Sequence, residues 1–315
     1  MLSRAFWTVG PARGELRTET LPDEALGMAR LRTLASGVSR GTERLVFEGR
    51  VPSSQYATMR APLMAGAFPF PVKYGYSAVG RDAEGRRFFV LHPHQEHLVA
   101  PAAMCVGVPD GVPTRRAVLA ANMETALNIV WDAAPLPGER VTIIGAGVVG
   151  LLAAALIARI PGVAATVVDI DASRAESSRS FGCRFAMPDA IPSSQDLVVH
   201  ASGSEDGIRR ALGCAAFEAR IVEASWFGDR APALPLGEAF HAKRLRLISS
   251  QVGHVAPAMR ERRTRRERLE LALALLADPG YDVLLEPPTP FEALPETMPR
   301  LLAHGLCHVV TYRDE

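Results

Sequence analysis

Three glycines follow a short apolar run at a place where a strand could turn directly into a helix. The run Val141–Ile144 leads into Gly145-Ala146-Gly147-Val148-Val149-Gly150, and the apolar stretch Leu151–Arg159 comes next. In such a turn the first glycine permits the tight bend, the second lets a ligand approach the backbone, and the third lets helix and strand pack closely. Backbone N–H groups at the helix start favour a pyrophosphate. The spacing predicts a dinucleotide-binding loop; a glycine turn in another kind of α/β protein is the alternative.

An acidic residue ends the next apolar run. Asp169 follows Ala164–Val168 and lies 24 residues after Gly145, near the offset of about 20 residues expected for a ribose-binding carboxylate. A carboxylate there accepts hydrogen bonds from both ribose hydroxyls and repels a 2′-phosphate. Arg174 is close enough in sequence to weaken that discrimination. The pattern favours NAD as cofactor, with NADP as the less favoured alternative.

The elements around the glycine turn alternate in type through residues 123–256. Three further strand-like runs are Leu197–His200, Arg220–Ala224 and Arg246–Ser249. This alternation predicts an α/β Rossmann fold, a doubly wound parallel sheet with helices on both faces. Residues 1–122 carry Gly, Pro and short β-like runs, which predict a mostly β domain. Residues 257–315 hold two helical runs and a final strand: Leu269–Leu276, Leu294–Ala303 and His308–Tyr312.

Composition narrows the classes of partner. The chain has 315 residues and a net charge of +1, so no overall field attracts nucleic acid or an anionic membrane. Its four cysteines are scattered, which favours free thiols. No apolar run is long enough to span a bilayer, and we expect a cytoplasmic protein. The arginine-rich stretch Arg260–Arg268 is interleaved with acidic residues and reads as a solvated helix face rather than a nucleic-acid site.

Several segments resemble the medium-chain dehydrogenase/reductase superfamily, the relatives of alcohol dehydrogenases. Besides the glycine turn, they are Ser36–Glu43, Tyr74–Gly80 and Pro290–Glu296. The resemblance implies a GroES-like β domain over residues 1–122, a Rossmann domain over 123–256, and a return to the first domain over 257–315. It also implies a homodimer that transfers hydride between a nicotinamide and a small alcohol, ketone or activated enone in the interdomain cleft. Residues 36–45 with 49–52 locally resemble the bacteriochlorophyllide dehydrogenases, a zinc-less branch.

The positions that hold zinc ligands in this superfamily carry other residues here. Ser39 or Arg40 stands at the first position, Tyr76-Ser77 at the second, and Ala121–Thr125 at the third. A catalytic zinc needs three nitrogen, sulfur or oxygen ligands and an open position. We therefore predict no zinc.

The resemblance also implies cofactor contacts outside the glycine turn. Thr125 matches a threonine at the nicotinamide, and Arg174 a basic residue beside the adenosine. Three serines follow later strands and are expected along the dinucleotide: Ser202, Ser225 and Ser250. Glu124, next to Thr125, is expected either to be functional or to turn away, because a buried carboxylate is costly unless paired.

Without zinc, another group must polarise the carbonyl or take the alcohol proton. Tyr76 is the first candidate, since a phenol can donate to a developing alkoxide; a tyrosine that only fills the space of the metal is the alternative. Lys73 could lower the pKa of Tyr76 or bind an anionic substrate; an ordinary surface lysine is the alternative. Thr42 and Glu43 match a pair that supports the zinc site, and Glu43 is expected to hold Arg40 or Lys73.

His94 could relay protons or be an ordinary loop histidine. His92 and His94 have the spacing of two metal ligands on an extended strand, with no third ligand nearby. A second hypothesis for the whole chain is a dinucleotide-binding protein that has lost catalysis and works as a sensor or structural partner.

Overall fold

A computed structural model describes residues 1–23 and 25–313 of the chain. The chain divides into two compact units. Unit 1 combines Met1–Ala121 with Leu269–Glu315, and unit 2 is Asn122–Arg268.

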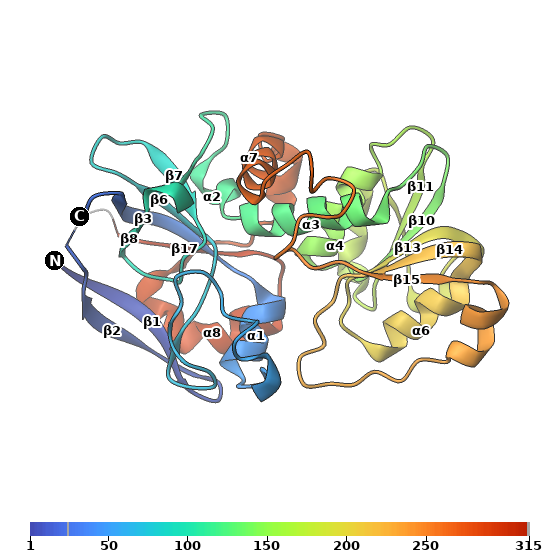
Figure 1. Ribbon diagram of the computed structural model, residues 1–315, viewed down its shortest axis with the longest axis horizontal. Coiled ribbons are helices and arrows are strands. Elements are labelled where there is room, and N and C mark those ends of the chain that lie inside the picture. Colours follow the sequence, from blue (N-terminus) through green and yellow to red (C-terminus); the bar gives the residue numbers. More distant parts are fainter. Residues whose placement is uncertain (24, 314–315) are drawn as a thin grey trace. The chain divides into compact units, whose positions relative to one another are not determined.

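Unit 2 is built around a six-stranded parallel sheet (Figure 1). Its order, β12-β11-β10-β13-β14-β15, is that of a dinucleotide-binding doubly wound fold. The central strand β10 is buried at every residue after Arg140, which explains its uniformly apolar sequence. The strands are β10 (Arg140–Ile144), β11 (Ala164–Val168), β12 (Arg184–Ala186), β13 (Gln195–His200), β14 (Ala215–Glu223) and β15 (Arg246–Ser249).

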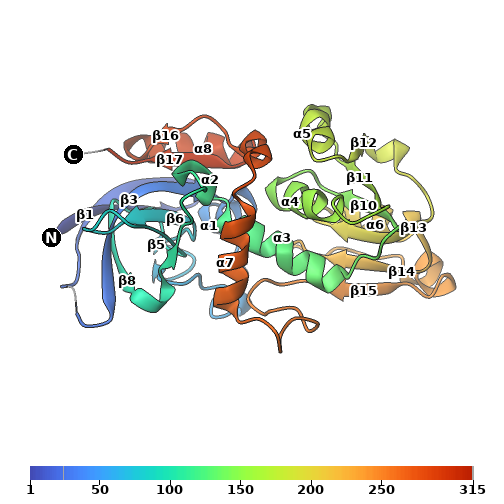
Figure 2. The same ribbon diagram turned by 90° about the horizontal axis from the view of Figure 1, so that it is seen from above.

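Helices cover this sheet. Helices α4 and α5 contact each other beside β10, β11 and β12 (Figure 2), and α6 packs its apolar side on β13 and β14 through Ile208 and Leu212. Helix α4 is almost entirely buried, as expected for its sequence. The helices of unit 2 are α3 (Ala120–Ala133), α4 (Val148–Ile157), α5 (Ala175–Ser180) and α6 (Glu205–Cys214), and α7 (Arg265–Leu275) begins in unit 2 and continues into unit 1.

Unit 1 contains two sheets. The four-stranded sheet has the order β2-β1-β5-β4, and the seven-stranded sheet runs β16-β17-β3-β6-β7-β9 with β8 paired to β3. All pairs are antiparallel except β16 with β17. The longer strands are β1 (Leu2–Gly10), β2 (Arg13–Thr20), β3 (Met28–Val38), β6 (Ala78–Arg81), β7 (Arg87–Val90), β8 (His97–Pro101) and β17 (His308–Thr311). The two-residue strands are β4 (Ala65–Gly66), β5 (Val72–Lys73), β9 (Val106–Gly107) and β16 (Thr289–Pro290).

The helices of unit 1 close its core. They are α1 (Arg40–Phe47), α2 (Thr114–Ala117) and α8 (Leu294–Ala303). Helix α8 places Leu294, Met298 and Leu301 on one face, where they join Phe6 and Phe47 in an apolar cluster. This β-rich unit and the parallel sheet of unit 2 confirm the predicted fold class.

The structure differs from the sequence-based expectation in several elements. Strand β14 begins at Ala215, five residues before the expected run, and the hairpin of β1 and β2 was not predicted because β2 is largely polar and half exposed. Residues 257–268 belong to unit 2 rather than to the returning segment. Arg268 accounts for this last difference, because it is buried and hydrogen-bonded to Glu124 within unit 2. Its burial also corrects the expectation that residues 260–268 form a solvated helix face.

No helix within residues 1–23 and 25–313 has the length and apolar character needed to cross a membrane.

Candidate functional site

The glycine turn has the geometry that a close backbone approach requires. Gly145 has a φ of 109°, and a Cβ there would lie 2.7 Å from the backbone nitrogen of Ser202. A Cβ on Gly150 would lie 1.9 Å from the carbonyl oxygen of Gly145, so only glycine lets α4 start this close to β10. Gly147, the residue before α4, faces open space. Val148 and Val149 form the first helical residues and are half-buried.

Asp169 lies against this turn. One carboxylate oxygen accepts the backbone N–H of Ala146 at 2.6 Å, and the other accepts that of Asp171 at 2.8 Å. A carboxylate has about four acceptor positions, so each oxygen keeps one for a further donor such as a ribose hydroxyl. Arg174 pairs with Asp171 at 3.1 Å. The structure therefore brings the glycine turn, Asp169 and Arg174 into one region of unit 2.

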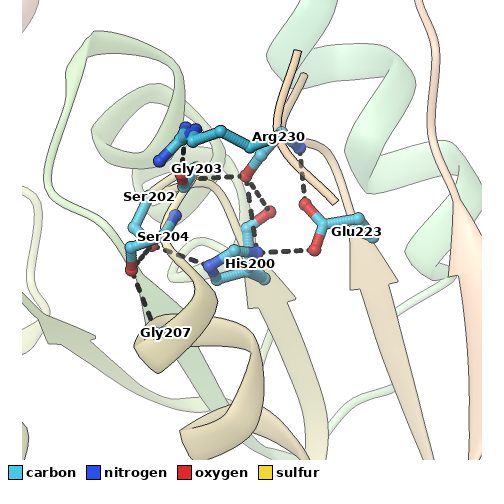
Figure 3. Close-up of polar contacts among 8 residues, drawn as sticks. His200, Ser202, Gly203, Ser204, Gly207, Glu223 and Arg230 are labelled. Atoms are coloured by element: carbon cyan, nitrogen blue, oxygen red, sulfur yellow. Dashed lines mark hydrogen bonds and ion pairs between the residues drawn. The ribbon is translucent and has the colours of Figure 1, made fainter. Parts of the chain in front are cut away.

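A buried histidine organises the ends of two neighbouring strands (Figure 3). His200 is 0% exposed, and its Nδ1 lies 2.6 Å from Oε2 of Glu223, its register neighbour on β14. Its Nε2 lies 2.7 Å from Oγ of Ser202. The Oγ of Ser225 accepts the N–H of Gly203 at 3.0 Å. Two of the serines predicted to bind cofactor thus surround a histidine and a glutamate that sequence analysis missed.

A second polar network fixes the segment after β15. Ser250 donates to Asp132 at 2.7 Å, and Asn128 donates to the same carboxylate oxygen at 3.0 Å. Burial raises the pKa of Asp132. Arg268 reaches the side chain of Asn128 and the carbonyl oxygens of Val252 and His254.

Glu124 belongs to the same network. Its carboxylate accepts from Arg268 at 3.0 Å, and both side chains are almost fully buried. Burial raises the pKa of Glu124, although the charge of Arg268 opposes that shift. Glu124 is therefore a structural partner of Arg268, whereas Thr125 lies next to it on α3, half-buried.

In unit 1, the start of α1 gathers polar groups around Tyr76. The phenol donates to Oγ of Ser39 at 2.5 Å, and the hydroxyl of Thr42 also hydrogen-bonds to it. The N–H of Ser39 in turn donates to Glu43 at 2.7 Å. Burial, followed by the negative charge of Glu43, raises the pKa of Tyr76 to about 12. Tyr76 therefore stays protonated at neutral pH and can act as a hydrogen-bond donor.

His94 connects Glu43 to the interior of unit 1. Its Nε2 lies 3.0 Å from Oε2 of Glu43, and its Nδ1 lies 2.7 Å from Oγ of Ser36. Ser36 Oγ is 2.8 Å from the hydroxyl of Tyr312, whose pKa is raised by burial. Because the Glu43 carboxylate accepts from Nε2–H, Nδ1 of the neutral imidazole is the acceptor for the Ser36 hydroxyl. His94 is thus part of a buried hydrogen-bonded chain rather than an unattached loop histidine.

The expected partners of Glu43 lie elsewhere. Arg40 donates to the backbone carbonyls of residues 302, 303 and 305. Lys73 is buried, pairs with Glu19 at 2.6 Å and donates to Gln95 at 3.0 Å. The structure corrects both the pairing of Glu43 with these cations and the reading of Lys73 as a surface lysine. Lys73 is committed to the β2 side of unit 1 and not to Tyr76.

The side chains at the expected metal positions do not suit zinc. Ser39 and Tyr76 are bonded to each other, and Ala121 offers no donor. His92 is buried with its Nδ1 at Pro93, and burial lowers its pKa to about 4. Within residues 1–23 and 25–313 no three His, Cys, Asp or Glu side chains are placed to hold one metal ion. Zinc needs three such ligands, so this donor set does not fit it.

Comparisons with known proteins agree with this fold. No family model matches the sequence. An uncharacterized zinc-type alcohol dehydrogenase-like protein of Haemophilus influenzae is 32% identical over 144 residues, which cover 42% of this chain and 42% of the relative. A probable D-xylulose reductase A of Aspergillus fumigatus is 24% identical over 187 residues, 54% of this chain and 49% of the relative. The chain thus spans less than half the length of these relatives.

Solved structures show similar folds over nearly the whole chain. An Escherichia coli alcohol dehydrogenase complexed with NADH has a TM-score of 0.79 at 15% identity, covering 98% of this chain and 99% of that one. A putative zinc-binding dehydrogenase of Sinorhizobium meliloti bound to NADP has a TM-score of 0.78 at 14% identity, covering 99% of both chains. A thermostable alcohol dehydrogenase of Pyrobaculum aerophilum has a TM-score of 0.80 at 17% identity, covering 99% of this chain and 100% of that one.

The parallel sheet with its glycine turn, joined to a GroES-like β unit, defines an alcohol dehydrogenase-like architecture. The chain is thus similar in fold to alcohol dehydrogenases over nearly its whole length, and similar in sequence to a zinc-type alcohol dehydrogenase-like protein and a probable D-xylulose reductase over about half of it.

Proposed function

We propose that this chain is a nicotinamide-dependent oxidoreductase that interconverts a small alcohol and its ketone, or reduces an activated enone. The observation that carries the proposal is the glycine turn with the Asp169 carboxylate 2.6 Å from the N–H of Ala146. This arrangement leaves Gly147 open to a pyrophosphate and leaves acceptor positions on Asp169 for a ribose. The bound nicotinamide would supply or accept the hydride.

NAD is the cofactor we propose, because the Asp169 carboxylate would repel the 2′-phosphate of NADP. Arg174 does not offset this strongly, since its guanidinium is paired with Asp171. Gly145, Gly147, Val148, Val149 and Gly150 would hold the pyrophosphate at the start of α4. Further contacts proposed along the dinucleotide come from Thr125, Ser202, Ser225 and Ser250.

Tyr76 is the group that we propose for the substrate oxygen, and zinc takes no part. With a pKa of about 12, its phenol donates a hydrogen bond to the oxygen of a ketone as negative charge develops there. Thr42 and Ser39 hold that phenol, and Glu43 with His94 holds Ser39 in turn. In this proposal Glu43, His94 and Thr42 are positioning residues, and Lys73 has no part in the chemistry.

One titration tests the cofactor. Fluorescence titration with NADH and NADPH should give tighter binding of NADH. Asp169→Ala should weaken NADH binding about 10-fold or more and bring the affinities for NADH and NADPH closer together. Asp189→Ala, an exposed aspartate in the same unit, is the control and should change neither affinity. Equal binding of both dinucleotides by the unaltered chain would contradict the choice of NAD.

A non-catalytic dinucleotide sensor is the second candidate. It is favoured by one observation, that the phenol proton of Tyr76 is already donated to Ser39. A screen of alcohols, polyols, ketones and enones with NAD or NADH separates the two, with metal content measured on the same sample. Turnover without bound zinc supports the enzyme; tight NADH binding without turnover on any class supports the sensor.

A further inference from the structure

His200, Glu223 and Ser202 form a linear hydrogen-bonded array at the carboxyl ends of β13 and β14 (Figure 3). Oε2 of Glu223 lies 2.6 Å from Nδ1 of His200, and Nε2 lies 2.7 Å from Oγ of Ser202. The carboxylate can only accept, so Nδ1 carries the proton, and in the neutral imidazole Nε2 is then an acceptor. The hydroxyl of Ser202 must then donate to the histidine. This is the proton arrangement that activates a serine nucleophile.

Neighbouring groups fix the positions of Glu223, His200 and Ser202. The N–H of Ser225 donates to the other oxygen of Glu223 at 2.7 Å and fixes the carboxylate. The imidazole is fully buried, whereas Ser202 is exposed and therefore reachable. The hydroxyl of Ser204 lies 2.9 Å from Oγ of Ser202 and caps α6 by accepting the N–H of Gly207.

The contact between Ser202 and His200 requires a residue without a side chain at position 207. A Cβ at this position would lie 2.4 Å from Oγ of Ser202 and 2.6 Å from Nε2 of His200. Glycine is unfavourable within a helix by about 1 kcal/mol relative to alanine. Gly213, in the same helix, has no such neighbour within 4 Å. The chain therefore accepts a helix-destabilising residue where a side chain would separate the serine from the histidine.

An open hollow of about 290 Å³ lies beside this array, lined by Glu205, Phe227, Arg230, Ala231 and Pro232. The ring of Phe227 stacks on His200 with centroids 6.1 Å apart. The guanidinium of Arg230 lies over Phe227 and donates to the carbonyl of Gly203 at 2.6 Å. The hollow thus offers an apolar wall and a cation next to the nucleophile, which suits a short acyl group with a polarised carbonyl.

We propose that Ser202 is an activated nucleophile and that unit 2 carries an acyl-transfer site for short-chain carboxylic esters. Oγ of Ser202 bonds to the carbonyl carbon while Nε2 of His200 takes the serine proton. The bond to the leaving alcohol oxygen then breaks, and His200 returns the proton to that oxygen. Water then attacks the carbonyl carbon of the acyl-serine while Nε2 of His200 takes its proton. The bond from that carbon to Oγ breaks, the acid leaves, and His200 returns the proton to Oγ of Ser202. The net reaction is ester plus water to acid plus alcohol, with no oxidation and no nicotinamide.

A fluorophosphonate probe carrying a reporter tag tests this on the full chain without any dinucleotide. Oγ of Ser202 would bond to phosphorus as fluoride leaves with the serine proton. Peptide mass spectrometry should find the adduct on Ser202. The labelling rate should fall about 100-fold or more in Glu223→Gln and Gly207→Ala, because the first removes the carboxylate charge and the second separates serine from histidine. Gly213→Ala, the matched control in the same helix, should label at the original rate.

Hydrolysis of p-nitrophenyl acetate should depend on the same residues and vanish above background in Ser202→Ala. An adduct on another serine, or labelling of Ser202 that Glu223→Gln and Gly207→Ala leave unchanged, would overturn the proposal. If Gly207→Ala proves unfolded by circular dichroism, Glu223→Gln alone decides, since it keeps the shape of the side chain. Ser202 is also one of the proposed dinucleotide contacts, so the probe is used on the chain without dinucleotide, and bound NADH should slow the labelling. Failure of the dinucleotide titration leaves the labelling of the free chain unaffected.

Discussion

Tyr76 keeps its proton at neutral pH because burial and the charge of Glu43 raise the pKa of the phenol to about 12. A phenol in this state is a poor base and a steady donor. It is therefore better suited to the reduction of a ketone, where the substrate oxygen gains charge, than to the removal of an alcohol proton. Ser39 and Thr42 hold the phenol while no substrate is bound.

Tyr76→Phe removes this donor without changing the shape of the ring. We expect kcat for ketone reduction to fall about 100-fold or more, with the affinity for NADH unchanged, because the phenol acts on the substrate oxygen alone. Steady-state kinetics and NADH titration measure the two quantities. Tyr74→Phe is the control, since Tyr74 is a buried neighbour whose ring meets that of Tyr76 edge-on at 6.0 Å. Full activity in Tyr76→Phe would remove Tyr76 from the mechanism.

His92 links the stability of unit 1 to pH. Burial lowers the pKa of His92 from 6.5 to about 4, so the unfolded chain binds more protons than the folded chain between these values. The stabilisation is complete above pH 6.5 and is lost as the pH falls toward 4. Between pH 7 and pH 5 the free energy of unfolding should fall by about 2 kcal/mol on this account.

Urea unfolding at both pH values measures that loss. His92→Gln cannot titrate and should remove most of the pH dependence, whereas His241→Gln, which changes an exposed histidine, should keep it. An equal loss in all three chains would mean that other groups cause it.

At the scale of elements, apolar runs revealed the strands and helices that are buried. β10 and β11 are buried after their first residue, so their sequences carry the pattern without interruption. The hairpin partner β2 has alternating charged residues and half-exposed positions, and it gave no such signal. Strand and helix positions around the dinucleotide turn could therefore be predicted, and the edge hairpin could not.

The polar pairs of the site join residues that are far apart in the sequence, so no local pattern of apolar residues predicts them. His200 and Glu223 face each other because β13 and β14 are parallel neighbours in register, 23 residues apart in sequence. A polar residue at the end of each of two apolar strands was the available signal. Arg268 and Glu124 lie 144 residues apart, and no local pattern distinguishes Arg268 from the exposed arginines before it.

The pair of Arg268 and Glu124 joins the two ends of the unit 2 segment. Arg268→Met should lower the free energy of unfolding by about 3–5 kcal/mol, because it leaves the Glu124 carboxylate buried without its partner. Arg262→Met, at an exposed position of the same arginine-rich stretch, is the control and should change stability little. Urea unfolding measures both. The double variant Glu124→Leu with Arg268→Met should recover part of the loss; a single variant as stable as the control would show that the pair is not required.

At the scale of the whole chain, unit 2 is one continuous segment with its own sheet and core. A fragment of residues 122–268 should therefore fold alone and bind NADH. The fragment 122–256, which ends where the sequence alone placed the boundary, lacks Arg268 and should be less stable by several kcal/mol. Thermal unfolding and NADH titration of both fragments test this. Equal stability would show that residues 257–268 are dispensable to unit 2.

Strand β17 pairs with both β16 and β3, although it follows all of unit 2 in the sequence. On the ribosome, every residue of unit 2 is synthesised before β17, so unit 2 can finish folding while unit 1 is still incomplete. During that interval one edge of β3 lacks its partner, and an unpaired edge of this kind favours aggregation. Strand β17 thus governs the yield of folded protein, and deletion of His308–Thr311 should lower the recovery of folded protein from cells more than the loss of four residues suggests.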